Sequence, residues 1–436
     1  MSHRRPLAAV VLLLCAGGPA GAAISEQQVG EAAQAVAAQV VTWRRDFHQN
    51  PELGNREFRT SKKVAEHLKS LGLEVRTGVA HTGVVGVLRG GQPGPVIALR
   101  ADMDALPVTE RVDLPFKSTT TAEYRGEKVG VMHACGHDGH TAILMGAAQA
   151  LSAMRAELPG TVLFVFQPAE EGAPDGEHGG APLMLEEGVF EGAKPEAVFG
   201  LHLWAQQNAG EVGYRIGPMM AASDRYRIVI KGQQTHGSSP WRGVDPIVVA
   251  SQVVLGMQTI VSRQTDLTQW PAVLSVGAIK GGIRNNIIPD SVELVGTFRT
   301  FDDGVRQEII DRLTRTAKDI AASAGATAEV EIATDNNPVL VNDPELTKRM
   351  LPTLERVAGA GKVREIPFVT ASEDFAVFAA RVPSLYFFVG STPQGQDASK
   401  APSNHSPSFY VDESSLQTGV KALLGLTVDY LQGSGR

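Results

Sequence analysis

The stretch PVIALRADMD, at residues 95–104, decides the expected fold. Its apolar run from Val96 to Leu99 is continuous rather than alternating, and it is followed by two aspartates, Asp102 and Asp104. A short continuous apolar run fits a strand that is buried on both faces of a parallel sheet. In open α/β sheets, ligands bind beyond the carboxyl ends of the strands, which is where the two aspartates stand. The stretch therefore predicts a parallel sheet with a polar site at one edge.

Further segments have the same pattern of an apolar run that carries or precedes an ionisable group or a glycine: TVLFVFQPAEEG at 161–172, EAVFGLHLW at 196–204 and VPSLYFFVG at 382–390. Helical patterns separate several of these runs, for example HTAILMGAAQALSAM at 140–154. Strands that alternate with helices favour an α/β fold with a mixed, mostly parallel sheet and helices on both faces. We expect this catalytic domain to comprise residues 23–216 and 335–436.

Residues 217–334 have a different order of strand and helix patterns, and they are expected to form a second domain inserted into the first. The pattern reads, in order, strand DRYRIVIKG, helix DPIVVASQVVLGMQTIVSR, strands AVLSVGAIKGG and SVELVGTFRTF, helix DGVRQEIIDRLTRTAKDIAASAG and strand TAEVEIAT. This β-α-β-β-α-β order is ferredoxin-like. Such a domain has an edge strand and a helical face that can pair with a copy of itself, so we expect a lid or dimerisation domain and at least a homodimer.

The composition excludes some classes of protein. Hydrophobic residues make up 43% of the 436 residues and charged residues 20%, which is ordinary for a globular chain of two or three domains. The 40 basic residues are fewer than the 47 acidic ones and are not concentrated in any segment, so a nucleic-acid partner is not expected.

The first 22 residues resemble a secretory signal peptide. Arg4 and Arg5 precede an apolar run, and Ala20-Gly21-Ala22 has the A-x-A form of a cleavage site. The alternative is a short buried helix. We expect cleavage near Ala22 and a secreted or periplasmic protein. No later stretch looks long and apolar enough to cross a membrane, so no membrane association is expected after cleavage.

The nine residues MHACGHDGH, at 132–140, hold the cysteine that would remain after cleavage, Cys135. An unpaired thiol in an oxidising compartment needs protection, and ligation to a metal would protect it. Cys135 and His137 offer a thiolate and an imidazole, which both suit zinc and similar ions. The alternative for His137 is a buried structural role. Asp138 is the expected N-cap of the helix that follows.

Other candidate ligands lie in separate segments. One carboxylate of the Glu170-Glu171 pair could bind metal while the other faces a water molecule, although adjacent acidic residues are often only solvated loop charges. His202 lies among apolar residues, where a histidine with satisfied hydrogen bonds is the common alternative. His405 lies in a loop before the last helix.

Together these segments resemble the aminoacylase and carboxypeptidase family of two-metal metallopeptidases, in its branch of hippurate hydrolases and amino-acid-conjugate amidohydrolases. The resemblance extends over nearly the whole chain after residue 22. It rests on RDFHQNPELG, LRADMDALP, HACGHDGH, FQPAEEG, GLHLW, THGSSP, NNIIPD, GTFRT, SEDFA and NHSPSFYVDE, in that order.

The resemblance implies a role for each matching residue. The ligands of two divalent ions, zinc or manganese, would be Cys135 as the bridge together with His137, Glu171, His202 and His405. Glu170 would be the general base, and Asp104 matches a catalytic aspartate behind the ligands. Asp102 is a weaker candidate, because it stands where related branches have a metal-binding histidine and His137 takes that role here.

Three residues of the inserted domain also match. His236 resembles a histidine that reaches a neighbouring active site, although a loop histidine without such a role would look the same. Asn286 and Arg299 resemble residues that bind the carboxylate of the substrate, and Arg suits a two-pronged grip on a carboxylate. The alternative for Arg299 is a solvated strand residue.

The expected activity is hydrolysis of an amide bond in N-acyl or N-aroyl amino acids, or in short peptides, with a free carboxylate. Two divalent ions would activate a water molecule, and Glu170 would accept its proton. One alternative is a hydrolase with Cys135 as nucleophile, which would need fewer metal-capable residues. Another is a catalytically silent metal-binding or peptide-binding protein, against which the presence of Glu170 speaks.

Overall fold

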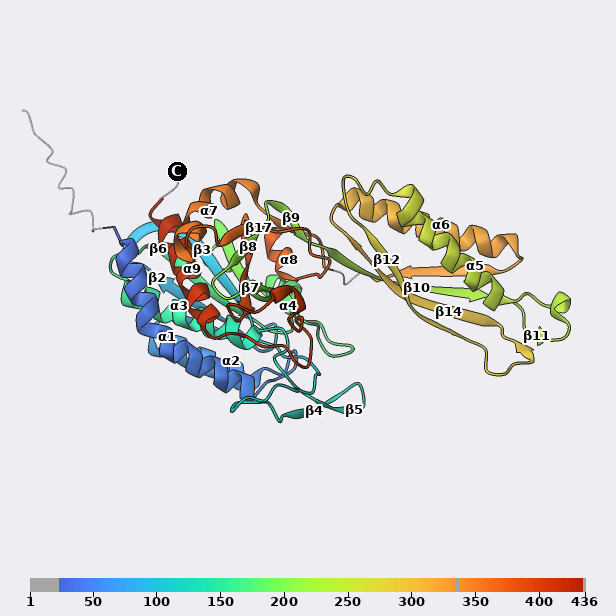
Figure 1. The fold of residues 1–436 in the computed structure, drawn as a ribbon, viewed down its shortest axis with the longest axis horizontal. Coiled ribbons are helices and arrows are strands. Elements are labelled where there is room, and N and C mark those ends of the chain that lie inside the picture. The colour runs from blue at the N-terminus through green and yellow to red at the C-terminus, as the bar shows by residue number, and fades with distance from the viewer. Residues whose placement is uncertain (1–22, 334–336, 434–436) are drawn as a thin grey trace, which may run out of the picture.

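The computed structural model describes residues 23–333 and 337–433, so the expected signal peptide lies outside the described part of the chain. Two lobes follow one another along the long axis of the molecule (Figure 1). The larger lobe is built on an eight-stranded sheet. Its strands are, in sheet order, β1 (Glu74–Val79), β2 (Gly83–Arg89), β6 (Pro159–Gln167), β3 (Gln92–Asp102), β7 (Ala197–Asn208), β18 (Ser384–Thr392), β8 (Val212–Tyr214) and β17 (Val363–Glu365).

The four apolar runs of the sequence form four adjacent strands in the middle of this sheet. β6, β3, β7 and β18 are mutually parallel. The pairs β1–β2, β2–β6 and β18–β8 are antiparallel, and β8–β17 is parallel. Four of the seven neighbouring pairs are therefore parallel, which confirms the prediction of a mixed, mostly parallel sheet.

Helices cover both faces of this sheet. One layer contains α1 (Glu26–Gln49), α2 (Phe58–Ser70), α3 (His137–Ala153), α7 (Pro344–Ala358) and α9 (Ser414–Leu431), and the other contains α4 (Gly180–Glu186) and α8 (Phe375–Ala379). Successive residues of a strand point to opposite faces. In β6, Phe164 and Phe166 accordingly pack in the first layer, and Leu163 and Val165 in the second. Burial on both faces explains why these strands are continuously apolar.

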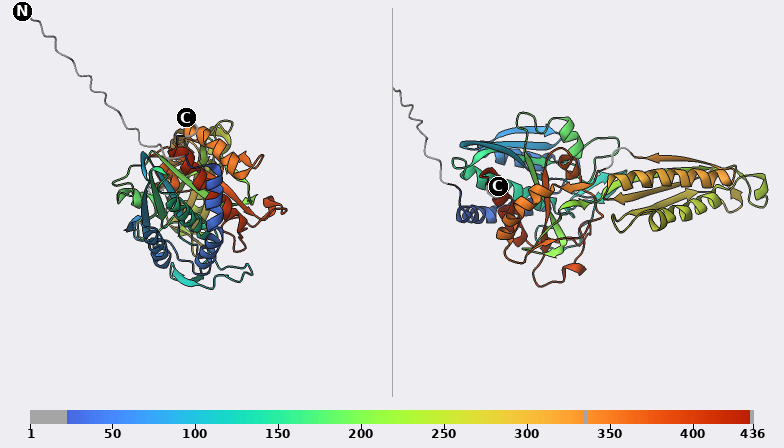
Figure 2. Two further views of the ribbon diagram at one scale, coloured as in Figure 1. Left: turned by 90° about the vertical axis from the view of Figure 1, so that its left-hand side faces the viewer. Right: turned by 90° about the horizontal axis from the view of Figure 1, so that it is seen from above.

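The smaller lobe is built on a four-stranded antiparallel sheet in the order β12-β14-β10-β15. Its elements are, in chain order, β10 (Ala222–Lys231), α5 (Pro246–Thr259), β12 (Val273–Gly281), β14 (Ser291–Thr300), α6 (Asp303–Ser323) and β15 (Thr327–Ile332). This is the β-α-β-β-α-β order read from the sequence. The lobe has its own apolar core between the helices and the sheet. Seen from above, it extends away from the larger lobe (Figure 2).

Short elements complete the fold: β4 (Thr121–Tyr124), β5 (Glu127–Gly130), β9 (Gly217–Met220), β11 (Thr235–His236), β13 (Ile287–Ile288), β16 (Leu340–Asn342), the 3-10 turns Pro240–Arg242 and Ala398–Lys400, and a π-helical turn, Ile260–Gln264, that extends α5. β11 pairs with β13 at the end of the smaller lobe that is farthest from the larger one (Figure 1). β9 pairs with β16, and Met219 and Met220 lie in the core of the larger lobe. The chain therefore passes into the smaller lobe after Met220, later than the boundary expected at Gly217.

One sequence expectation about membranes is wrong as stated. The helical run Pro246–Gln264, in α5 and the turn after it, is long and apolar enough to cross a bilayer, although 33% of its apolar window is buried inside the protein. In the structure this run packs on the sheet of the smaller lobe through Val249, Val253 and Met257.

Candidate metal centre

Neighbouring parallel strands bring polar side chains to one level at the edge of the larger sheet. Asp102 ends β3 and pairs with Gln167, which ends β6. β7 continues past this level, and its His202 pairs with Phe388 of β18. The turn after β6 carries Glu170 and Glu171. The expectation that these groups meet at the carboxyl ends of the strands is therefore met.

Cys135 and His137 reach the same edge from the start of α3. The prediction that Asp138 caps this helix is wrong, because Gly136 occupies the N-cap position with a φ of 97°. A positive φ favours glycine, and a Cβ at this position would lie 3.2 Å from the Cβ of Leu203. The Asp138 carboxylate instead accepts a hydrogen bond from Nε of Arg44 at 2.8 Å and lies 2.8 Å from Nδ1 of His48.

All five predicted metal ligands come together, in two triads that share one sulfur atom. The ligand atoms of each triad lie within 4.8 Å of one another, and the triads are Cys135, His137 and His202, and Cys135, Glu171 and His405. The Sγ atom of Cys135 is 3.4 Å from Nε2 of His202 and 3.2 Å from Nε2 of His405. Sulfur and nitrogen ligands of one tetrahedral zinc ion lie roughly 3.5 Å apart. The arrangement matches a thiolate shared by two ions.

Two of the histidines are oriented as metal ligands by backbone carbonyls. Nδ1 of His137 lies 2.9 Å from the carbonyl oxygen of Asp104, and Nδ1 of His202 lies 2.8 Å from that of Leu203. A carbonyl oxygen only accepts, so each Nδ1 carries the proton, and in the neutral ring Nε2 keeps a lone pair. Nε2 of His137 is buried and has no hydrogen-bond partner among the described residues. Burial opposes a charge on this ring, but Asp102 and Asp104 raise the pKa of His137 to about 10, so an ion bound at Nε2 would displace a proton. A ring held at one nitrogen and directed into the cluster at the other fits a metal ligand.

The electrostatics of the cluster also fit cations. Burial, together with the charges of Glu171 and Glu170, raises the pKa of the Cys135 thiol well above its usual range. Burial lowers the pKa of His202 well below its ordinary value, so this ring is neutral and can donate its lone pair. A set of thiol, imidazole and carboxylate groups suits zinc and related divalent ions. Binding of such ions would displace the proton of the thiol.

Asp104 holds the turn that carries the two glutamates. Its Oδ1 accepts a hydrogen bond from the backbone N–H of Glu170 at 3.1 Å, and its Oδ2 accepts one from that of Glu171 at 3.0 Å. Its Oδ1 also lies 3.3 Å from Nδ1 of His137. Asp104 therefore lies behind the cluster, as the family resemblance implies, and contacts both His137 and the backbone of Glu171.

Asp102 is occupied by partners other than a metal. Its Oδ1 lies 2.6 Å from Nδ1 of His140, whose Nε2 accepts a hydrogen bond from the N–H of Leu203 at 2.8 Å. Both nitrogens of His140 are therefore used, although Asp102, His137 and His140 are close enough to suggest a further ion. His140 is a structural member of the histidine cluster.

Sequence reasoning missed a buried arginine, Arg100, that is linked to Glu170 through Asp374. The guanidinium of Arg100 donates hydrogen bonds to Asp102 at 2.6 Å, to Glu373 at 2.9 Å and to Asp374 at 2.9 Å. The N–H of Asp374 in turn donates to Oε1 of Glu170 at 3.4 Å. An arginine at the end of a buried apolar strand, in LRAD, was the signal that could have suggested a buried ion-pair network.

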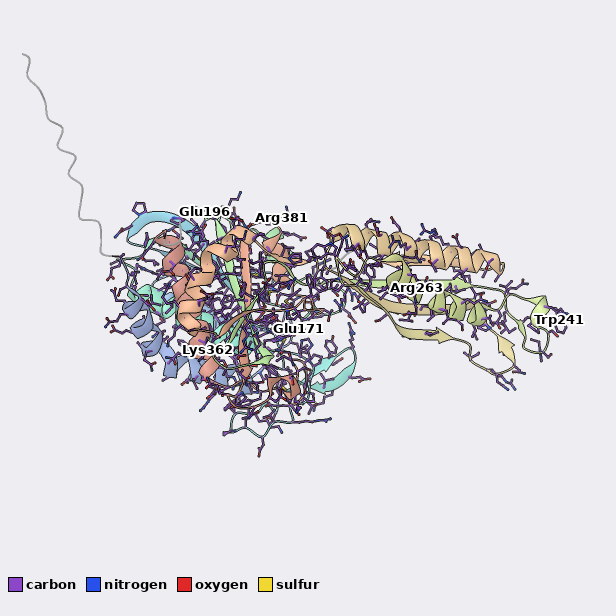
Figure 3. All side chains as sticks on the ribbon, turned by 45° about the horizontal axis from the view of Figure 1, so that its top comes forward. Glu171, Glu196, Trp241, Arg263, Lys362 and Arg381 are labelled. Atoms are coloured by element: carbon purple, nitrogen blue, oxygen red, sulfur yellow. The ribbon has the colours of Figure 1, made fainter. Side chains whose placement is uncertain are left out.

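The three candidates from the smaller lobe lie away from the cluster of their own chain. His236 is exposed in β11, and Asn286 is beside it, since the N–H of Gly237 donates to the carbonyl oxygen of Asn286 at 2.9 Å. Trp241, close to β11 in sequence, lies at the far tip of the lobe, whereas Glu171 lies within the larger lobe (Figure 3). Arg299 instead contacts the larger lobe, where its Nη1 donates to Oγ of Ser372 at 3.4 Å. Within one chain, Asn286 and Arg299 do not meet.

Comparison with known proteins gives a consistent family. Peptidase family M20/M25/M40 matches residues 98–429. Thermostable carboxypeptidase 2 of Saccharolobus solfataricus is 41% identical over 392 residues, which cover 90% of this chain and 95% of that protein. N-acetylcysteine deacetylase of Bacillus subtilis is 37% identical and covers 90% of this chain and 97% of its own. IAA-amino acid hydrolase ILR1-like 2 of Arabidopsis thaliana is 36% identical, with coverage of 90% and 85%.

A solved structure supports the same relation. The Bacillus subtilis YXEP protein, described as a dinuclear metal binding peptidase from the M20 family, superposes with a TM-score of 0.76 at 35% identity. The match covers 92% of this chain and 99% of that one.

Proposed function

The chain belongs to peptidase family M20/M25/M40 and is a metal-dependent hydrolase of amide bonds, and from this premise we propose that it cleaves N-acyl or N-aroyl amino acids, or short peptides with a free carboxylate. The observation that carries the proposal is the Cys135 thiol, which two triads of candidate ligands share, with Glu170 close to His137 and Glu171. The names of the relatives, a carboxypeptidase, a deacetylase of N-acetylcysteine and a hydrolase of IAA-amino acids, share an amino acid bound through an amide.

The residues present fit two divalent ions, for which zinc and manganese are the candidates. Cys135, His137, Glu171, His202 and His405 would hold them. When bound, such ions supply a water molecule of lowered pKa and an electrophile for the amide carbonyl. Half of the His405 side chain is exposed (54%), while His137 and Cys135 are buried, so substrate would approach from the side of His405.

Glu170 would move the proton. Its Oε2 lies 3.9 Å from Nε2 of His137, a member of the first triad. Burial and the charges of Glu373 and Glu171 raise the pKa of Glu170 well above its ordinary value. A carboxylate with a raised pKa is a better base, and it can accept the proton of the attacking water and return it to the leaving amine.

The alternative with Cys135 as nucleophile is less well supported. Reactive cysteines have a lowered pKa, whereas burial and nearby carboxylates raise that of Cys135. The thiol also lies among four other metal-capable side chains, His137, Glu171, His202 and His405, rather than beside one base.

We further propose that two copies of the chain pair through the smaller lobe. Its two helices differ in their outer faces. Between Pro246 and Thr259, α5 has no charged side chain, and Leu255 is 71% exposed. The exposed face of α6 instead carries Asp303, Glu308, Asp311, Arg315, Lys318 and Asp319. An uncharged, apolar outer face on one helix is typical of an interface.

The two edge strands of the smaller lobe show the same asymmetry. β15 carries exposed Glu329 and Glu331, which form ion pairs with Lys231 and Arg227. The other edge strand, β12, contacts α5, whereas β15 contacts α6. β12 exposes Val273 and Ile279. Charges protect an edge strand from pairing, so β12 is the edge available to a second copy.

Pairing would give the distant tip a role. His236 and Asn286 lie together at the far end of the lobe, and we propose that they enter the metal centre of the partner, where Arg299 of that chain helps to bind the substrate carboxylate. Asn286 has a buried Oδ1 with no hydrogen-bond partner among the described residues.

We also propose that the protein is exported, on the basis of Arg4, Arg5 and the Ala20-Gly21-Ala22 site. Mass spectrometry of the exported protein should find an N-terminus near Ala23, and a chain that keeps Met1 in the cytoplasm would contradict export.

The substrate class is tested with matched pairs of compounds. N-benzoyl and N-acetyl amino acids are each compared with their carboxylate methyl esters, after loading of the protein with Mn²⁺ or Zn²⁺. We expect kcat/KM to fall at least ~10²-fold for the esters, because a site built to bind a charged group rejects an analogue that lacks it. Equal cleavage of acid and ester, or no cleavage of any acid, would refute the proposed substrate class.

A further inference from the structure

The turn that carries Glu170 is held by two buried carboxylates, those of Glu57 and Asp104. Of the two, only Asp104 is a candidate catalytic residue. Three consecutive backbone N–H groups donate to them: Ala169 to Oε1 of Glu57 at 2.8 Å, Glu170 to Oδ1 of Asp104 at 3.1 Å and Glu171 to Oδ2 of Asp104 at 3.0 Å. Glu57 lies 112 residues before Ala169 and has no exposed surface.

The turn has a conformation that needs such support. Ala169 has a φ of 50°, in the left-handed region that is unfavourable for a residue with a Cβ. The loop before Glu57 also packs closely on the turn. A Cβ at Gly54 would lie 2.6 Å from the carbonyl oxygen of Gly172 and 3.1 Å from the Cβ of Ala169. The backbone at Gly54 therefore lies directly against the turn.

Glu57 stands at the N-cap of α2 but does not cap that helix. The cap is supplied by Glu52, whose two carboxylate oxygens accept from the N–H groups of Arg59 at 2.9 Å and Thr60 at 2.8 Å. The carboxylate of Glu57 turns away from α2 and accepts from Ala169 and from Oγ1 of Thr82, the latter at 2.5 Å.

The partners of Glu57 are thus an amide and a hydroxyl rather than a cation. Burial and the charge of Asp104 raise the pKa of Glu57 to about 8. Burying a carboxylate is costly unless hydrogen bonds compensate for the lost water. The two hydrogen bonds of the Glu57 carboxylate therefore connect Thr82 to the turn at Ala169.

We infer that Glu57 is a positioning residue for the reaction: it fixes the turn at Ala169 so that Glu170 faces the attacking water. The kinetic part of this inference rests on the proposed function, but the structural part does not. Misplacement of a reacting group by about 1 Å can cost about 10²-fold in rate.

The test uses the metal-loaded, full-length mature protein and four variants. Glu57→Ala removes the carboxylate, Glu57→Met keeps its volume without an acceptor, and Glu57→Gln keeps an acceptor for the Ala169 N–H. Glu52→Ala is the matched control, because Glu52 also binds two backbone N–H groups but only those of α2. Hydrogen exchange of the 168–172 segment, metal content, kcat and KM are measured for each.

For Glu57→Ala and Glu57→Met we expect faster exchange in the 168–172 segment and a fall in kcat of about 10- to 100-fold, with two ions per chain retained. Glu57→Gln should recover most of the lost rate. Glu52→Ala should lower Tm through the lost helix cap but leave kcat within about twofold.

Unchanged exchange at 168–172 in both Glu57→Ala and Glu57→Met would overturn the inference, as would a loss of kcat no larger than in Glu52→Ala. If Glu57→Ala does not fold, the comparison of Glu57→Met with Glu57→Gln decides. A wild-type protein without amidase activity would contradict the proposed function, while the exchange data would still decide the role of Glu57.

Discussion

Glu170 and Glu171 are neighbours in sequence, but their surroundings assign them different tasks. Oε1 of Glu171 lies 3.0 Å from Nε2 of His405, within a triad that shares the Cys135 sulfur. Glu170 lies toward Glu373 and Asp374, and its pKa is raised well above the ordinary value. These surroundings favour the proposed division, in which Glu171 would hold an ion and Glu170 would carry a proton.

Glu170→Gln is the sharpest test of this division. The amide keeps the shape of the side chain but cannot accept the proton, so we expect both ions to remain bound while kcat falls at least ~10²-fold. Elemental analysis and steady-state kinetics measure the two effects. Glu177→Gln is the control, since Glu177 lies in the same loop but pairs with Arg56 at the surface. Turnover close to that of the wild type in Glu170→Gln would show that another group is the base.

Among single residues, the sequence predicts the candidate metal ligands better than the buried residues that hold the surrounding loops in place. Cys135, His137 and Glu171 can be read locally, because each stands in a short segment rich in metal-capable groups. Arg100 and Glu57 cannot be read in this way, since Arg100 meets Glu373 across 273 residues and Glu57 meets Ala169 across 112. Such pairings depend on how strands and loops stack in space, which the local pattern does not encode.

The elements follow the sequence closely where the hydrophobic period is clear. The strands of the smaller lobe, for example β10 (Ala222–Lys231) and β14 (Ser291–Thr300), lie where the sequence pattern predicts them. The start of α3 was misjudged, because Asp138 satisfies the rule for an N-cap but is recruited by Arg44 and His48 instead. Tertiary hydrogen bonds outweighed the local preference there.

The difference between α5 and α6 leads to a prediction about assembly. Leu255→Lys places a charge on the apolar outer face of α5, and we expect it to shift a dimer toward monomers by at least ~10-fold in Kd, because burying an unpaired lysine in an interface is unfavourable. Light scattering across a concentration series measures the shift.

The matched control is Ala322→Lys, which adds the same charge to an exposed position of α6. This variant should associate as the wild type does. Equal association of Leu255→Lys and the wild type would exclude the outer face of α5 from the interface.

The arrangement of the whole molecule could not have been predicted from its segments. The sequence suggested an inserted domain, but the placement of β11, which contains His236, at the end of the smaller lobe farthest from the larger one depends on how the two lobes are joined (Figure 1). The larger lobe gathers five candidate ligands from four separated segments, and the smaller lobe carries its candidate residues at both of its ends. Under the proposed pairing, a complete site would use residues of two chains, whereas the five candidate metal ligands lie within one.

The central claim, that one chain holds two ions between which Cys135 is shared, is tested most directly by a metal titration of chelated protein. Mn²⁺ or Zn²⁺ is added in steps while hydrolysis of an N-acyl amino acid, bound metal and alkylation of Cys135 are followed together. We predict no turnover without metal, maximal turnover at two ions per chain, and protection of the thiol as the ions bind. Full turnover in metal-free protein that is abolished by alkylation of Cys135 would contradict this claim and would identify the cysteine as the nucleophile.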